Sequence, residues 1–306
     1  MGFTIHYDPR LIEETVALLM RREPGAEYWR ERDSVYAQAD PEEREQGFRA
    51  LHEREFRRRG LDRPLARTLA EEPLIAGALE SCRALFCVTR KEEGADIAVA
   101  RGPGPSRHLL LRLRPESLIE GNGLVPFLRR ELLHVRDMVD PAFGYDPTPP
   151  VFDGAPALQK LILARYRVLW DVTVDGRLRR RAHAGAEERR RVGEEFARHF
   201  GMLGVRVGEA FQRLVDFLQP THAMLLEAAS EPWSLLEPAG RRPQSRSHCS
   251  LCACPRIDDA PVAALAARLA PFVRADFPAW CEEDPVCPQC VELYRARAIL
   301  AGGAVR

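Results

Sequence analysis

Hydrophobic side chains recur three and four residues apart over most of the chain, a spacing that is typical of amphipathic helices. Asp8-Pro9 predicts the start of the first helix, because proline is favoured in a first helical turn. Gly60 and Gly176 are placed to end two others, and Pro141 should end a third one residue earlier. The helices predicted in this way cover 11–19, 41–59, 124–139, 156–175 and 192–230.

Short apolar runs between turn residues predict β-strands in the middle of the chain. These runs are 84–89, 95–100 and 108–113. Charged residues, glycine and proline separate them, as in strands that are joined by loops. We therefore expect an α+β fold, mainly helical, with a small antiparallel sheet.

Changes in composition divide the chain into four parts. Residues 1–75 are expected to form an N-terminal helical region, and 76–230 an α+β domain with a helical extension. Residues 231–247 are rich in proline, arginine and serine and are expected to form a linker. Residues 248–306 carry six of the eight cysteines and are expected to form a small zinc-binding module.

The 306 residues are 45% hydrophobic and have a formal net charge of zero. A neutral chain has no general attraction to nucleic acid or to an anionic membrane. No apolar run is long enough to span a membrane, and the N-terminus lacks the pattern of a secretory signal. We therefore expect a cytoplasmic protein, without a membrane partner, that binds another protein.

Basic side chains are concentrated in one run, Arg177–Arg191, which two glutamates interrupt. We interpret this run as a solvated connector. The alternative is a nucleic-acid-binding patch around Arg179–Arg181, but no aromatic residues alternate with the arginines to stack on bases. A nucleic-acid partner is therefore weighed below a protein partner.

The cysteines near the C-terminus contain the clearest chemical signal in the chain. Cys249 and Cys252 form one C-x-x-C pair, and Cys287 and Cys290 form another, with 34 residues between the pairs. Two such turns can offer four thiolates to one tetrahedral zinc ion. Four sulfurs leave no open position for a substrate, so the predicted zinc is structural.

Other cysteines and one histidine are surplus to this quartet. His248, Cys254 and Cys281 are expected to be packing residues, although any of them could replace a ligand. Cys82 and Cys87 are expected to be buried small hydrophobes. An iron–sulfur cluster is the competing interpretation of the quartet, because thiolates suit both metals. The second pair precedes a predicted helix, so the last fifty residues resemble a treble-clef or zinc-ribbon module.

The predicted helix that begins at Leu124 carries a second candidate site. Its residues Arg130-Glu131-Leu132-Leu133-His134 place a carboxylate and an imidazole three residues apart, on neighbouring turns. In the related motif H-E-x-x-H, two histidines on one helical face bind zinc, and the glutamate is the general base for the bound water. This chain has the glutamate and the second histidine of that motif.

The segment resembles the zincin metallopeptidase superfamily over about residues 84–175, where strands precede the motif helix and an acidic helix follows it. The resemblance implies that Glu131 is the general base and that His134 is the second zinc ligand. By the same resemblance, Asp171 or Asp175 matches the third ligand.

Arg130 occupies the position of the first histidine, and a guanidinium cannot coordinate a cation. A second, catalytic zinc is therefore expected to be absent or weakly held, unless Asp137, His108 or His183 joins the site. Arg130 is expected to replace the metal as the local positive charge and to pair with the nearby acids.

Three hypotheses on function follow from these two sites. The first is a zincin-related zinc protein whose catalytic site is degraded and which acts in binding or assembly. The second is an active zinc-dependent peptidase or hydrolase that uses Glu131 and His134. The third is a zinc-finger protein that binds nucleic acid through the arginine run.

Overall fold

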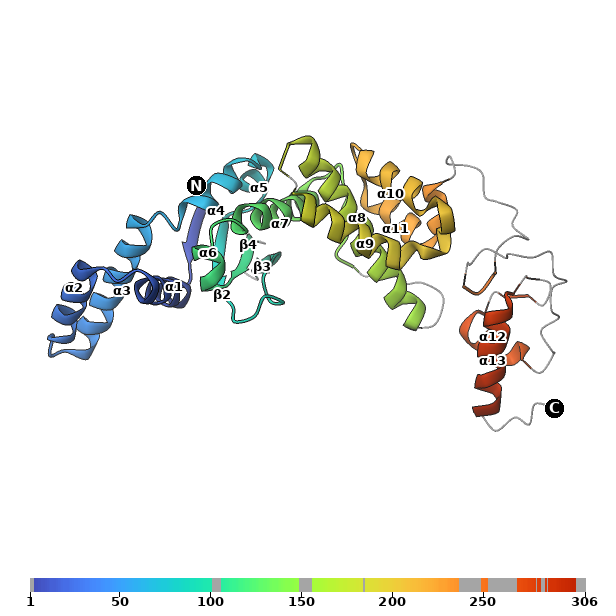
Figure 1. Cartoon of the computed structure of the whole chain (residues 1–306), viewed down its shortest axis with the longest axis horizontal. Helices are drawn as coiled ribbons and strands as arrows, with labels where there is room; N and C mark the ends of the chain where they lie inside the picture. Colours follow the sequence, from blue (N-terminus) through green and yellow to red (C-terminus); the bar gives the residue numbers. More distant parts are fainter. Residues whose placement is uncertain are drawn as a thin grey trace. The chain divides into compact units, whose positions relative to one another are not determined.

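The computed structural model describes residues 3–100, 106–148, 156–183, 185–236, 249–252, 269–278, 280–281, 284 and 286–300. The chain forms two compact units, Met1–Tyr145 and Asp146–Arg306, which Figure 1 shows in the colours of the sequence. The sheet belongs to the first unit, and the elements described in the second unit are helices. The expected α+β class is therefore confirmed, and the finer division into four parts stays a prediction.

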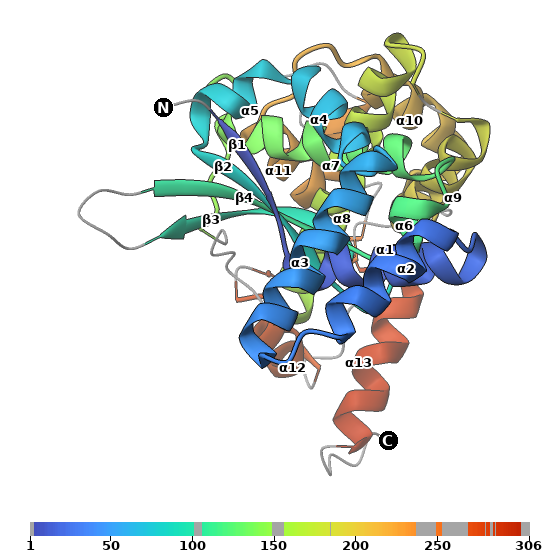
Figure 2. The ribbon, with the colours of Figure 1, turned by 90° about the vertical axis from the view of Figure 1, so that its left-hand side faces the viewer.

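Four strands form the sheet of the first unit (Figure 2). They are β1 (Thr4–Tyr7), β2 (Ser81–Phe86), β3 (Gly94–Ala100) and β4 (Ser106–Leu113), in the order β1-β2-β4-β3. β2 is parallel to both β1 and β4, whereas β3 is antiparallel to β4. The sheet is therefore mixed: β3 and β4 form the expected antiparallel pair, whereas a helical crossover returns the chain from β1 to β2 in the same direction.

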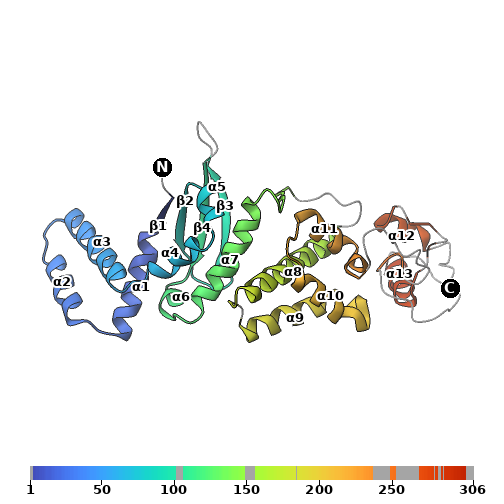
Figure 3. The same cartoon turned by 90° about the horizontal axis from the view of Figure 1, so that it is seen from above.

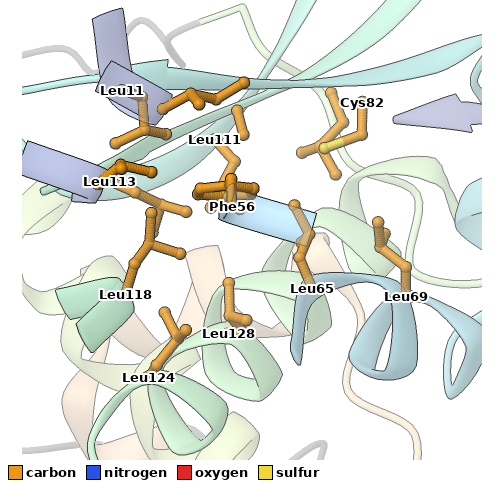
Figure 4. Close-up of a cluster of buried hydrophobic side chains, with 14 of the residues drawn as sticks. Leu11, Phe56, Leu65, Leu69, Cys82, Leu111, Leu113, Leu118, Leu124 and Leu128 are labelled. Carbon is orange, nitrogen blue, oxygen red and sulfur yellow. The ribbon is translucent and has the colours of Figure 1, made fainter. Parts of the chain in front are cut away.

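Side chains alternate between the two faces of this sheet, and one face carries the core of the unit. Cys82, Leu109 and Leu111 on that face are fully buried. Helices α1 (Pro9–Arg22) and α7 (Leu124–Val139) contribute further apolar side chains to the same cluster, among them Leu11 and Leu128 (Figure 4). The second predicted site thus lies on a helix that is packed firmly against the sheet.

The ends of several helices follow from local chemistry. The carboxylate of Asp8 accepts a hydrogen bond from the backbone N–H of Arg10 at 2.9 Å and caps α1. Helix α7 ends before Asp140-Pro141, as predicted. The other helices of the unit are α2 (Ala26–Tyr36), α3 (Pro41–Arg58), α4 (Arg63–Ala70), α5 (Pro73–Ala78) and α6 (Pro115–Ile119).

In the second unit, α8 (Pro156–Arg180) contacts α9 (Ala186–Phe200), α10 (Val207–Asp216) and α11 (His222–Ser230), as Figure 3 shows. The prediction that Gly176 ends α8 is wrong. A Cβ atom at Gly176 would lie 2.2 Å from the carbonyl oxygen of Val215, so the glycine allows two helices to approach closely instead. Arg180 fixes the same contact by donating a hydrogen bond to that oxygen at 2.7 Å.

The C-terminal segment has its own small hydrophobic cluster. Helices α12 (Ala270–Asp276) and α13 (Pro288–Leu300) supply most of it, and the predicted helix after Cys290 is thereby confirmed. Two short 3-10 helices, η1 (Gly201–Arg206) and η2 (Pro232–Leu235), precede this segment. Most of the predicted linker, 237–247, lies outside the described residues. Among the described helices, none combines the length and the apolarity that a membrane crossing requires.

Candidate metal centre

The four predicted cysteines converge, although 34 residues separate the two pairs. The sulfur atoms of Cys249, Cys252, Cys287 and Cys290 all lie within 4.8 Å of one another. Cys287 directly precedes α13, and Cys290 lies in its first turn. The N-terminus of a helix favours negative charge, so this turn suits thiolates.

The distances fit a single tetrahedral ion. With Zn–S bonds of about 2.3 Å, the sulfurs of a regular ZnS₄ site are about 3.8 Å apart. The sulfurs of Cys252 and Cys287 are 3.7 Å apart. No disulfide joins these four cysteines. The cluster therefore has the dimensions of a metal site of one ion.

The electrostatics of the cluster show how closely the thiols interact. A hydrogen bond from the Cys290 thiol lowers the pKa of Cys249 to about 4, against a smaller opposing effect of burial. Backbone hydrogen bonds from Cys287, Cys252 and Leu251 lower it further. The same thiol contact, followed by burial and the negative charge of Cys249, raises the pKa of Cys290. One thiolate thus forms readily, while a second requires a compensating positive charge, which a divalent cation supplies.

Among the described residues of the module, apolar side chains pack around the cysteines. Trp280 and Val291 are buried beside Cys287 and Cys290 in one cluster. The Tyr294 hydroxyl donates a hydrogen bond to Asp276 at 2.9 Å and so joins α13 to α12. These residues were not among the predicted site residues, although the apolar positions three and four apart in 287–298 could have indicated them.

The cysteines and the histidine outside the quartet differ in position. Cys281 is exposed, and its backbone N–H donates to the carboxylate of Asp284 at 2.9 Å. It is not part of the four-cysteine group. His248 and Cys254 lie outside the described residues. Cys82 and Cys87 are buried in the first unit, as predicted, and burial raises their pKa values to about 12 and about 11.

Glu131, the predicted general base on α7, binds the sheet. One carboxylate oxygen accepts a hydrogen bond from the backbone N–H of Ala95 at the start of β3, at 2.9 Å. Within the described residues of the first unit, Glu131 and His134 belong to no group of three or more potential metal ligands. Asp171 and Asp175 lie on α8 in the second unit, so the predicted degenerate site draws on both units.

Neighbouring charges on α7 also have structural partners. Arg129 binds Glu71 through two hydrogen bonds of 2.8 and 2.7 Å, and Arg136 lies 3.6 Å from Glu72. These ion pairs join α7 to the segment between α4 and α5. Arg130 and His134 are half-buried on the same helix, and Asp137 is buried.

The alternative histidine ligand in the first unit is already hydrogen-bonded. In His108, Nδ1 lies 3.0 Å from the Ser81 hydroxyl, and Nε2 lies 3.0 Å from the Ser106 hydroxyl. Both ring nitrogens are therefore engaged, and a metal would have to displace a hydroxyl. His183, the other alternative, belongs to the second unit.

Part of the arginine run is paired within the protein. Arg190 pairs with Glu187 and Glu194, and Arg191 pairs with Glu188. Arg180 donates to the carbonyl oxygens of Val215 and Phe217 rather than to solvent. The two ion-paired arginines offer less free positive charge to a phosphate, whereas Arg180 keeps its charge and is held by the backbone of the second unit.

Comparisons of the whole chain with known protein families, curated proteins and solved structures give no match.

Proposed function

We propose that this chain is a zinc protein in which one zinc ion, bound by Cys249, Cys252, Cys287 and Cys290, holds the C-terminal module together. The observation that carries the proposal is the convergence of four sulfurs within 4.8 Å. An ion with four protein ligands has no open position for a substrate, so its role is structural. A reducing compartment such as the cytoplasm would keep these thiols available for the metal.

Zinc accounts for the arrangement better than an iron–sulfur cluster. A cluster of several iron atoms places its cysteines around a larger body than a single ion does. Here every sulfur lies within 4.8 Å of every other, and one pair is 3.7 Å apart. Tetrahedral coordination by four thiolates at this spacing is typical of structural zinc.

The proposal includes a relation to zincin metallopeptidases in which the catalytic metal site is degraded. The support for the relation is the Arg130-Glu131-Leu132-Leu133-His134 segment on a helix that follows strands. The support for degradation is chemical. Arg130 cannot coordinate a cation, and Glu131 already accepts a hydrogen bond from Ala95. We therefore propose a role in protein binding or assembly rather than in peptide hydrolysis.

X-ray absorption spectroscopy on the purified full-length protein tests the zinc site directly. The proposal predicts zinc with four sulfur neighbours at about 2.3 Å. A first shell that contains nitrogen or oxygen, or iron in place of zinc, would contradict it. The visible spectrum serves as a control, because an iron–sulfur cluster is coloured and zinc thiolate is not.

A further inference from the structure

The sheet of the first unit has a second face, which lies opposite to the helices. The registers of the strands place three rows of side chains on this face. Most of these side chains are exposed or half-buried, and none belongs to the core cluster. The rows, from the N-terminal end of β2 onward, are Thr4, Ser81, His108 and Ala98; then His6, Arg83, Leu110 and Asp96; then Leu85, Arg112 and Gly94.

Two exposed arginines define the charge of this face. Arg83 on β2 and Arg112 on β4 have no carboxylate within 4 Å among the described residues of the unit, and Glu92 acts on Arg112 only at longer range. By contrast, Arg114, just beyond the end of β4, is bound to Glu93 at 3.1 Å. The face therefore presents two guanidinium groups that are available to an anion.

The spacing of the two arginines can be derived from the register. Arg83 lies opposite Leu110, so Arg112 is two residues further along the neighbouring strand. Strands lie about 4.8 Å apart and two residues span about 6.6 Å, so the two Cα atoms are about 8 Å apart. Half-buried Leu85 and Leu110 lie between them. The result is an apolar floor between two bidentate donors.

The positive charge of this face and the spacing of its two arginines favour an extended acidic peptide as the ligand. In an extended peptide, side chains two residues apart lie on the same side and are about 7 Å apart, so two carboxylates in a Glu-x-Glu pattern can each meet one arginine. Asp96, the one acid on the face, is held at the edge strand, where its carboxylate accepts the backbone N–H of Ile97 at 2.8 Å. The two arginines therefore outnumber the single acid among the described positions of this face.

Single-stranded nucleic acid fits this face less well. Proteins that bind it on an open sheet stack bases on aromatic side chains. The face carries no phenylalanine, tyrosine or tryptophan at its described positions, because Tyr7 and Phe86 point to the core side. We propose that the open face of the sheet binds an extended acidic segment of a partner protein, with Arg83 and Arg112 as its carboxylate receptors. This inference rests on the proposed binding role and specifies that the partner protein offers an acidic segment.

Fluorescence anisotropy with a labelled peptide of five Glu-Ser repeats tests the proposal on the full-length, zinc-loaded protein. The peptide should bind, and added salt should weaken the binding. Arg83→Gln/Arg112→Gln should weaken it about tenfold or more. Arg83→Lys/Arg112→Lys should give a smaller loss, because lysine keeps the charge without the guanidinium fork.

Arg49→Gln/Arg57→Gln is the matched control, since it removes the same charge from α3, where these arginines pair with Glu45 and Glu53. This control should leave the affinity unchanged. An absent signal for the peptide, an equal loss in the control, or tighter binding of a ten-nucleotide thymidine strand would each overturn the proposal. The zinc content is measured separately, so a failed titration leaves the zinc site standing.

Discussion

The candidate site on α7 and the four-cysteine centre are held in place by different means. Helix α7 packs on a large apolar core in which Leu128 and Leu132 are fully buried. Its Glu131 and Arg129 bind the backbone of Ala95 and the side chain of Glu71. The cysteines have only a small cluster around them, built largely from two short helices.

The two regions should therefore differ in their dependence on a metal. A helix that is secured by burial and ion pairs keeps its place without an ion, and its polar residues serve the fold. The described residues of the C-terminal module bury a small apolar cluster, so we expect the proposed zinc ion to contribute much of its stability. The first region should therefore be insensitive to metal, and the second should depend on it.

The largest expected effect is the loss of the zinc site. Cys290→Ser should abolish zinc binding and disorder α12 and α13, because structural zinc contributes an apparent binding free energy of about 10–16 kcal/mol. Hydrogen exchange should show lost protection in α13 and unchanged protection in α7. Cys281→Ser is the control and should retain the metal, since that exposed cysteine is outside the group. Persistent protection of α13 after zinc loss would break the comparison.

The next effect concerns the core beneath α7. Leu128→Ala should destabilise the first unit by about 2–5 kcal/mol, because it leaves a cavity at a fully buried position. Urea denaturation monitored in this unit measures the change, with Val88→Ala, at an exposed site, as the control. The zinc content should not change. A loss of zinc in Leu128→Ala would show that the two regions depend on each other.

Glu131 gives a smaller effect that separates a structural role from a catalytic one. Glu131→Ala should cost about 1–3 kcal/mol, because the backbone N–H of Ala95 loses its acceptor. Glu131→Gln should cost less, since its side-chain carbonyl can still accept that bond. If Glu131→Ala left the stability unchanged but lowered the zinc content, the residue would belong to a metal site instead.

The smallest effect is a pH dependence of the stability of the first unit. Burial lowers the pKa of His52 below 6.5, with Arg32 acting in the same direction and Glu13 against it. The unfolded chain therefore binds a proton more readily than the folded chain, and stability should fall as the pH falls below about 6.5. Denaturation at pH 7 and pH 5 should show the difference in the native protein. His52→Gln should reduce this difference in the free energy of unfolding. An equal difference between pH 7 and pH 5 in the native protein and in the variant would contradict the assignment to His52.

The helices and the cysteine centre could be predicted because local patterns encode them. Asp8-Pro9 and Asp140-Pro141 mark helix ends through local chemistry, namely the proline ring and the side-chain cap of Asp8. The C-x-x-C pairs carry their ligand spacing in the sequence. The strand β1 was not predicted, because four residues contain too little periodicity, and its parallel pairing with β2 depends on contacts some 75 residues away.

Gly176 and Glu131 make contacts that the sequence could not predict. The local sequence does not show whether a glycine ends a helix or leaves room for the backbone of a neighbouring helix. At Gly176, only the approach of the Val215 backbone distinguishes the two cases. Likewise, a glutamate three residues before a histidine fits part of a catalytic motif, and the sequence does not show that the carboxylate of Glu131 accepts a hydrogen bond from the backbone of Ala95. Tertiary contacts decide such cases, and the local pattern does not contain them.

The most direct test of the central claim is to count zinc ions by native mass spectrometry in the full-length protein and in two variants. The account predicts one zinc ion per chain in the native protein and in His134→Ala, and none in Cys287→Ser/Cys290→Ser. A second zinc ion in the native protein that disappears in His134→Ala would contradict it.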